Sequence, residues 1–563
     1  MATASALLLD EFYESADPRF LAEILASTAA KKLKTFADRW YRDARPFARG
    51  MLLAYIADGC DRPHHRPLVK ALFKLAEKAS DDEAMGCFLV AFDRLAARRL
   101  KEVWRWNPAT RTSEKEQILG RDPSVPGKLG SKENRAPRFS RRTRTYLARR
   151  AFRYFRLVAR VDAARYGRAI RAALTRYEDA HLVKPEQLLD AWSLLHALYW
   201  GSPEIVRDPR GARVAEGRSL AELVPAPFAP EAWRGAFDAV LDLVTQARSR
   251  TVRVFAIALL RRDHADELRS MPLRRARALL RSPHDEVQTF AATLLRDATG
   301  VHNLSLDEWL ELLKIDNPTA IPLLCELVSK TVSPDRLSLA QCVELACARP
   351  APVAELGLRW AKLKPVNDAA ALTTAIGLAR AGAPEVRREG VAWVAGLIEK
   401  ASFATAEHVR DLVDARFPDA RAEGLSLITK DARFRDSTLI WGALAESPYD
   451  DVRGQMVKHL GDRQGAFGAD TLRSVWITAL LSVHRGGRAK RLALQQIAAR
   501  VAKKPAEAES LLPLLGIALR SVRAPERRSA LSAVATAALR EPALGRAISR
   551  LLPELALGGE VAL

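Results

Sequence analysis

Apolar residues recur in the second half of the chain with the three- and four-residue spacing of an amphipathic helix, and the same pattern returns several times. The copies read TVRVFAIALL from 251, EVQTFAATLL from 286, TAIPLLCELV from 319, PVAELGLRWA from 352, EVRREGVAWV from 385, DARAEGLSLI from 419, DVRGQMVKHL from 451, RAKRLALQQI from 488 and, more weakly, PERRSALSAV from 525. Aligned on their second residue, successive copies begin 32 to 37 residues apart. The pattern predicts one helix per copy.

Each interval leaves room for a second amphipathic helix, such as SLDEWLELLKI at 305–315 or TAEHVRDLVDA at 405–415. Several copies begin at or just after a proline, which is favourable in the first turn of a helix. A small residue often stands four positions after the alignment point, as at Gly357, Gly390 and Gly424. We expect it to let neighbouring helices approach closely. A period of this length built from two helices indicates an α-solenoid.

The stretches SPYDDVRGQMVKHLG and APEVRREGVAWVAGL, with a proline shortly before Val-Arg, resemble the HEAT repeat. The resemblance covers roughly residues 240–563, and it implies a surface that binds macromolecules. In HEAT-like repeats the arginine of the Val-Arg pair usually supports the stacking of repeats. The resemblance therefore implies a structural role for Arg253, Arg387, Arg421 and Arg453.

The first half is also helical but less regular, and the predicted fold class is all-α. We expect an N-terminal helical region with degenerate repeats at 1–104, a flexible loop or linker at 105–140, a basic helical region at 141–240 and the repeat solenoid at 241–563. The linker prediction rests on four prolines and three glycines among mixed charges. PEQLLDAWSLLHALYWGSPEI at 185–205 predicts a buried helix that ends near Gly201.

The segment at 140–160, SRRTRTYLARRAFRYFRLVAR, contains eight arginines and no acidic residue. On a helix, Arg142, Arg149, Arg153, Arg156 and Arg160 share one narrow face. The opposite side carries Leu147, Ala151, Tyr154 and Val158, which we expect to pack on the solenoid. Tyr146 and Tyr166 lie near the basic face and are candidates for stacking on bases, whereas Phe152 and Phe155 are expected to point inward.

Charge is concentrated in two windows. The chain has a net charge of +22, of which residues 132–176 contribute fifteen basic and two acidic residues, and residues 485–528 eleven basic and three acidic residues. The rest of the chain is nearly neutral. We interpret this distribution as a neutral scaffold with two basic patches that suit a polyanion. The abundance of Arg and Ala also suggests a GC-rich bacterial genome.

Five dispersed cysteines predict no disulfide framework and favour the cytoplasm. The first 30 residues lack the basic start and apolar core of a signal peptide. No run of 18 uncharged apolar residues predicts a membrane span.

No enzyme motif is present, and we expect neither catalysis, nor a cofactor, nor a metal site. GRDPSVPGKL at 120–129 does not fit a phosphate-binding loop, because six residues separate its glycines and leucine follows the lysine. Cys60, His64 and His65 lack a fourth zinc ligand, and the histidines are expected to be solvated. Some DNA alkylpurine glycosylases share the HEAT-like fold. Trp360, Trp393 and Trp441 are candidates for their groove tryptophan, but packing roles are the expectation.

The sequence therefore favours a non-catalytic solenoid that binds DNA or RNA through backbone phosphates, without sequence specificity. The predicted contacts are Arg141, Arg142, Arg144, Arg149, Arg150, Arg153, Arg156, Arg160, Arg165 and Arg168 in the first patch, and Arg488, Lys490, Arg491, Lys503, Lys504, Arg527 and Arg528 in the second. The alternative is a protein–protein scaffold in a multi-subunit bacterial complex.

Overall fold

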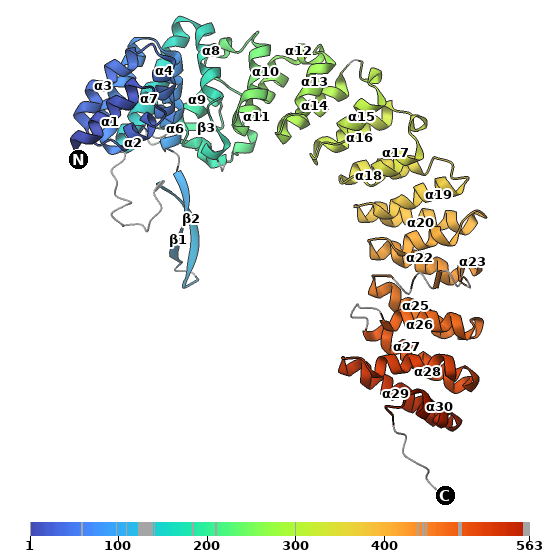
Figure 1. Ribbon diagram of the computed structural model, residues 1–563. Helices are drawn as coiled ribbons and strands as arrows, with labels where there is room; N and C mark the ends of the chain where they lie inside the picture. The colour runs from blue at the N-terminus through green and yellow to red at the C-terminus, as the bar shows by residue number, and fades with distance from the viewer. Residues whose placement is uncertain are drawn as a thin grey trace. The chain divides into compact units, whose positions relative to one another are not determined.

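The computed structural model (Figure 1) describes residues 2–57, 60–96, 98–107, 110–121, 139, 141–182, 185–208, 211–298, 300–435, 437, 440–441, 444, 447–481 and 487–555. The chain folds into two compact units, Met1–Val301 and His302–Leu563. Helices dominate both units, and the strands among the described residues form one long and one short hairpin in the first. The all-α solenoid that the repeat pattern predicts is confirmed.

The first unit begins with irregularly arranged helices and ends with two repeat-like helix pairs. Its helices are α1 (Ala2–Glu14), α2 (Phe20–Ala26), α3 (Ala30–Arg42), α4 (Pro46–Ala57), α5 (Arg66–Lys78), α6 (Asp82–Ala96), α7 (Arg141–Val161), α8 (Ala163–Leu174), α9 (Trp192–Tyr199), α10 (Phe237–Gln246), α11 (Arg250–Asp263), α12 (Ala265–Arg269), α13 (Leu273–Leu280) and α14 (Asp285–Asp297). Within this unit α6 contacts α4, α5, α7, α8 and α9. The arginine-rich segment is thus packed into a helical core.

A long β-hairpin follows α6. Strands β1 (Arg98–Asn107) and β2 (Thr112–Arg121) pair antiparallel over their whole length, with Trp104 opposite Lys115. The prediction of a flexible loop from residue 105 is therefore wrong as far as residue 121. Residues with a high strand propensity, such as Val103, Trp104 and Trp106, favour strand pairing. Residues 122–138, the rest of the predicted linker, lie outside the described residues.

The helix predicted at 185–205 is confirmed in part. Residues Trp192–Tyr199 form α9, which is largely buried and ends just before Gly201, whereas Pro185–Leu189 form a separate 3-10 helix. The N-terminus of α9 is capped by the fully buried Asp93 of α6, whose carboxylate accepts hydrogen bonds from the backbone N–H groups of Ser193 and Leu194 and from the Tyr177 hydroxyl. A short hairpin of β3 (Ile205–Asp208) and β4 (Gly211–Val214) follows. Asp93 thus fixes α9 against α6.

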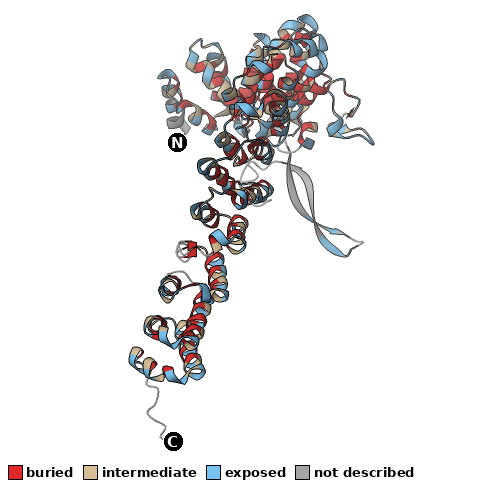
Figure 2. Cartoon of the chain, turned by 90° about the vertical axis from the view of Figure 1, so that its right-hand side faces the viewer, coloured by how far each residue is buried: buried red, intermediate tan, exposed pale blue. Residues whose placement is uncertain are grey.

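The second unit stacks helical hairpins in two rows. Its helices are α15 (Leu306–Leu312), α16 (Ala320–Thr331), α17 (Leu339–Ala346), α18 (Ala351–Ala361), α19 (Ala369–Ile376), α20 (Pro384–Lys400), α21 (Ala406–Val413), α22 (Pro418–Lys430), α23 (Ala432–Arg435), α25 (Asp450–Asp462), α26 (Ala469–Leu481), α27 (Gly487–Lys503), α28 (Ala508–Leu519), α29 (Ala524–Arg540) and α30 (Gly545–Leu551). One row runs through α16, α18, α20, α22, α25, α27 and α29, each in contact with the next. Buried residues line the facing sides of these helices (Figure 2).

The predicted close approach at the small residues is confirmed. A Cβ atom added to Gly357 of α18 would overlap the backbone of Ala346 in α17, and one added to Gly424 of α22 would lie 2.7 Å from a Val413 methyl group in α21. Real Cβ atoms do not approach so closely, so each glycine allows its two helices to pack backbone to backbone. The repeat thereby keeps its two helices in tight contact.

The arginine of the Val-Arg pair is buried in every repeat that has one. Nη1 of Arg387 donates to the carbonyl of Ala381, six residues earlier, at 2.8 Å, and Nε pairs with Asp419 of the next repeat at 2.9 Å. Arg421 repeats both contacts with Ala415 and Asp451. Arg253 does so with Ala247 and Glu286 in the first unit. The structure therefore assigns Arg253, Arg387 and Arg421 a bracing role between consecutive repeats. Arg453 is equally buried and donates to the carbonyl of Ser447, but it pairs with Asp450 of its own helix.

Candidate nucleic-acid interface

Helix α7 presents its arginines to solvent, as its pattern predicts. Arg149, Arg153 and Arg160 are exposed and Arg156 is half-buried, whereas Leu147, Ala151, Tyr154 and Val158 on the opposite side are buried. Aromatic residues Phe152 and Phe155 are also buried. The predicted orientation of the helix is therefore confirmed. The helix backbone includes Arg141, Arg142 and Arg144, but their side chains lie outside the described residues.

Three exposed cations of the predicted first patch have no hydrogen bond or ion pair with any described residue. These are Arg153 and Arg160 on α7, and Arg168 on α8, all of them exposed. An exposed guanidinium without an internal acid keeps its full charge and all its donors for an external ligand. We call Arg149, Arg153, Arg156, Arg160 and Arg168 the arginine face.

Two arginines of the predicted set have internal partners instead. Arg150 pairs with Glu77 at 2.5 Å, and this carboxylate raises the pKa of the guanidinium. Arg165 pairs with Asp82 at 2.8 Å and also donates to the carbonyl of Ser80. Both contacts connect the basic helices to the neighbouring α5–α6 region. These two arginines hold α7 and α8 in place, so we leave them out of the arginine face.

The two tyrosines considered for base stacking differ in their surroundings. Tyr146 is 49% exposed, and its hydroxyl accepts a hydrogen bond from Arg150 at 3.2 Å. Tyr166 is fully buried, which excludes it as a stacking platform. It lies on the side of α8 that packs into the core, and the sequence pattern near Arg165 and Arg168 did not reveal this orientation.

Other rings lie beside the arginine face. Trp192 and Trp200 occupy opposite ends of α9, with His196 between them. The guanidinium carbon of Arg149 lies 4.6 Å from the Trp192 ring centroid, and that of Arg156 lies 5.0 Å from the Trp200 centroid. The sequence predicts α9 only as a buried helix. The four-residue spacing of Trp192, His196 and Trp200 is the sequence signal that places the three rings in one row along the helix.

The residues of the second basic patch fall into two groups, those at the bracing position of the repeat and those that line a groove. Lys490 and Arg527 occupy the position of the bracing arginines: Lys490 pairs with Glu526 at 3.4 Å, and Nη1 of Arg527 donates to the carbonyl of Ser521, six residues earlier. Lys504 lies 3.7 Å from Glu507. The alignment of the repeats already contained the signal for Lys490 and Arg527, because both follow the aligned residue directly.

Arg491 and Arg528 instead line a groove of about 710 Å³ formed by α25, α27 and α29. Two further cations that the sequence analysis missed, Lys458 and Arg540, line the same groove, and Asp462 is its single carboxylate. All four cations are exposed and have no ion pair with a described residue. Arg488 and Lys503 are exposed, but they are not among the groove residues.

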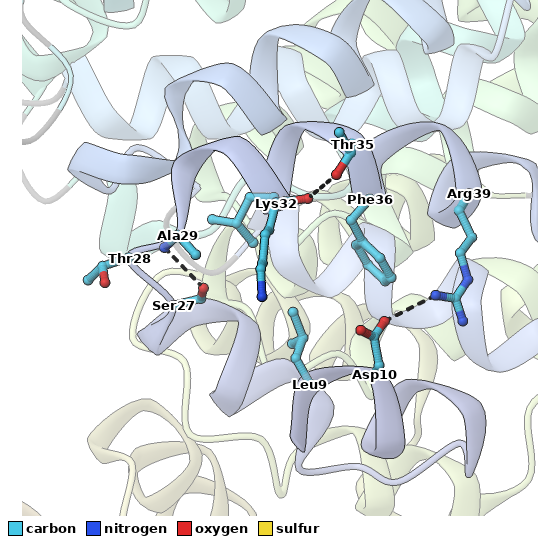
Figure 3. A pocket seen from close by; sticks show the side chains of 10 residues that line it. Leu9, Asp10, Ser27, Thr28, Ala29, Lys32, Thr35, Phe36 and Arg39 are labelled. Atoms are coloured by element: carbon cyan, nitrogen blue, oxygen red, sulfur yellow. Dashed lines mark hydrogen bonds and ion pairs between the residues drawn. The ribbon is translucent and has the colours of Figure 1, made fainter. Parts of the chain in front are cut away.

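A smaller cavity of about 330 Å³ lies between α1 and α3 (Figure 3). Arg39 there pairs with Asp10 at 3.1 Å. The hydroxyls of Ser27 and Thr35 are engaged with main-chain atoms of Ala29 and Lys32. The charged and hydroxyl groups of this cavity are thus mostly engaged with each other and with the backbone, and we assign it no chemistry.

Within the described part of the chain, no three His, Cys, Asp or Glu side chains come together as a metal site. Cys60 and His65 are buried, and His65 bonds the Tyr55 hydroxyl and the carbonyl of Ser27, so the expectation of two solvated histidines holds only for His64. Trp360 and Trp441 are buried and Trp393 is half-buried. No helix among the described residues is both long and apolar enough to cross a lipid bilayer.

No protein-family model and no curated protein matches this chain. Solved structures that align with it include Kap121p bound to the SUMO protease Ulp1p (12% identity, 98% of this chain and 64% of that chain, TM-score 0.23) and Kap121p bound to RanGTP (12%, 98%, 64% and 0.25). UNC-45 from Drosophila melanogaster also aligns (13%, 98%, 79% and 0.21). The chain spans less than two thirds of these Kap121p chains.

Proposed function

We propose that this protein is a non-catalytic α-solenoid that binds nucleic acid through its backbone phosphates, using the arginine face of the first unit. The observation that carries the proposal is the contrast between arginines within that unit. Arg150 and Arg165 are matched by carboxylates, whereas Arg153, Arg160 and Arg168 are exposed and without an internal acid. Guanidinium groups arranged along one helix face suit a row of phosphates.

The groove of the second unit supplies a second anion-binding surface in this proposal. Lys458, Arg491, Arg528 and Arg540 face one carboxylate, so the groove retains an excess of positive charge. The ligand class is the same, because a polyanion is attracted by both surfaces irrespective of its sequence. Bacterial origin, a cytoplasmic location and the choice between DNA and RNA remain predictions within this proposal.

The test is a salt titration of binding to labelled DNA and RNA, with a charge-reversal variant and a matched control. We expect R153E/R160E/R168E to lower affinity at least about a hundredfold at low salt. The variant should also reduce the slope of log affinity against log salt concentration by about three, one for each lost phosphate contact. These side chains are exposed, so thermal stability should change little.

The matched control is R66E/R274E/R281E, which changes the net charge equally at three exposed arginines of the same unit that have no partner among the described residues. It should retain affinity within about threefold, because charges outside a contact surface are screened. Equal losses of affinity in both variants would show that only the net charge of the protein matters. Absence of binding by the unmodified protein at low salt would exclude the proposal.

A second candidate function is a protein–protein scaffold, which the long hairpin favours. Trp104 and Trp106 of β1 are 67% and 62% exposed. Large apolar side chains exposed side by side often mark a protein contact. In that case W104A/W106A would abolish assembly with a partner protein and leave oligonucleotide binding within about twofold.

A further inference from the structure

Three rings form a ladder along α9 and the residue that follows it. Trp192, His196 and Trp200 follow one another at intervals of four residues, and their ring centroids lie 4.0 Å and 5.2 Å apart. His196 is buried, whereas both tryptophans are half-buried and so present part of their rings to solvent. Tryptophan rings open to solvent offer stacking surfaces for other flat groups.

Three guanidinium groups lie against this ladder. Arg149 lies over Trp192, and Arg156 and Arg207 lie over Trp200, with centroid distances of 4.6, 5.0 and 5.7 Å. Arg207 comes from β3, so the cluster joins three separate elements of the first unit. We call these three arginines and the three rings of α9 the Trp–Arg cluster.

The positive charge of this cluster lacks an internal counter-ion at two of its arginines. Arg156 makes no hydrogen bond or ion pair with a described residue, and its Nε atom is buried without a partner. Nε of Arg207 is also buried without a partner, although its terminal nitrogens donate to the carbonyls of Tyr199 and Ile205. Burial lowers the pKa of Arg207. Buried donors without acceptors are rare and unfavourable, so an anion bound there would be stabilised.

The histidine between the tryptophans adds an aromatic ring and no charge. Burial and, to a smaller extent, the neighbouring charges of Arg207, Arg156 and Arg149 lower the pKa of His196 to about 4, against a hydrogen bond to the carbonyl of Trp192 that raises it. The ring is therefore neutral at physiological pH. The cluster thus combines three cations with aromatic surfaces, and its described residues include no carboxylate.

We propose that the Trp–Arg cluster binds one nucleotide of a single strand, whose base stacks on the exposed tryptophan surface while its phosphate pairs with Arg156. This inference rests on the proposed function and names the class of nucleic acid bound by the arginine face. Aromatic rings interleaved with cations are the features by which proteins hold unpaired bases and their backbone. A duplex offers the phosphates but keeps its bases stacked on each other, and an acidic peptide lacks the flat ring.

The experiment compares binding of oligothymidylate of about 15 nucleotides with binding of a duplex of the same length at one salt concentration. The variants are W192L and W200L, and the control is W393L, which changes a half-buried tryptophan of the second unit. We expect W192L and W200L to weaken single-strand binding roughly tenfold or more and to leave duplex binding within about twofold. W393L should leave both unchanged.

Equal weakening of single-strand and duplex binding, or no change in either, would overturn the inference while the proposed function stands. Failure of the unmodified protein to bind either ligand would instead reject the proposed function. Displacement of the single strand by polyglutamate as efficiently as by an unlabelled oligonucleotide would also overturn the inference.

Leucine at position 200 removes contacts with Phe152 and Phe228, so thermal melting must show that the variant is folded. A second measurement uses the unmodified protein. Oligonucleotides containing 5-iodouracil should photo-crosslink to the peptide that carries Trp192 and Trp200. A crosslink mapped only to other peptides would contradict the inference.

Discussion

The bracing arginines of the repeats and the arginine face of α7 place the same side chain in opposite surroundings. Arg387 is buried, stacks 3.7 Å from the Phe417 ring centroid and has both an acid and a carbonyl as partners. Arg153 on α7 is exposed and has no partner among the described residues. An arginine that recurs at a fixed repeat position supports the fold, whereas one that lies outside the repeat and has no internal acid is available to a ligand.

The largest expected effect on stability comes from removing a bracing arginine. We expect R387A to lower the free energy of unfolding of the second unit by about 3 kcal/mol, because it leaves the Ala381 carbonyl and Asp419 without their partner. The matched control is R388A, since Arg388 is exposed and pairs only with Glu385 on its own helix. The control should stay within about 0.5 kcal/mol.

Urea unfolding of the full chain, followed by circular dichroism, measures both variants. Because repeats can unfold separately, hydrogen exchange of α20 and α22 serves as a local readout. Similar stability of R387A and R388A would show that a bracing arginine contributes no more to stability than an exposed one.

The repeats and the braces could be predicted from the sequence because both recur. A helix that must bury one face against its neighbours repeats its apolar positions from copy to copy, and in several copies also its small residue and its arginine. The alignment even places Lys490 and Arg527 at the bracing position, although their basic neighbours drew them into the predicted binding patch. Repetition thus carried more information than local charge.

The arginine face could be predicted only in part. Its orientation followed from the apolar side of α7, but the pairing of Arg150 with Glu77 and of Arg165 with Asp82 joins residues more than seventy positions apart. No local pattern encodes such pairs. The Trp–Arg cluster also escaped prediction, because it combines α7, α9 and β3, which come together only in the folded unit.

A smaller expected effect distinguishes a bracing residue from a groove residue within α27. Lys490 is a brace that faces Glu526, and the adjacent Arg491 lines the groove. We expect K490M to lower the free energy of unfolding by roughly 1–2 kcal/mol and to leave nucleic-acid affinity unchanged. R491E/R528E should lower affinity about tenfold and leave stability nearly unchanged. Loss of affinity in K490M without loss of stability would reverse these assignments.

The smallest expected effect on the unmodified protein concerns pH, because two opposing pKa shifts beside α9 nearly cancel. Burial raises the pKa of Asp93 to about 6 in the folded state, whereas burial and the nearby arginines lower that of His196 to about 4. The stability from Asp93 is fully present below about pH 4 and is lost as the pH rises through 6. The stability from His196 is present above about pH 6.5 and is lost as the pH falls toward 4.

The two contributions therefore oppose each other between about pH 6.5 and 4, and each amounts to roughly 3 kcal/mol. We expect D93N to lose stability more steeply than the unmodified protein on acidification, because His196 then acts alone. H196Q should become relatively more stable over the same range. Urea unfolding followed by tryptophan fluorescence at several pH values measures both slopes. Parallel slopes of stability against pH in the two variants would show that the surroundings of α9 do not shift the pKa values of Asp93 and His196 in opposite directions. The arginines over the ladder would then be as well compensated by other charges as the bracing arginines are.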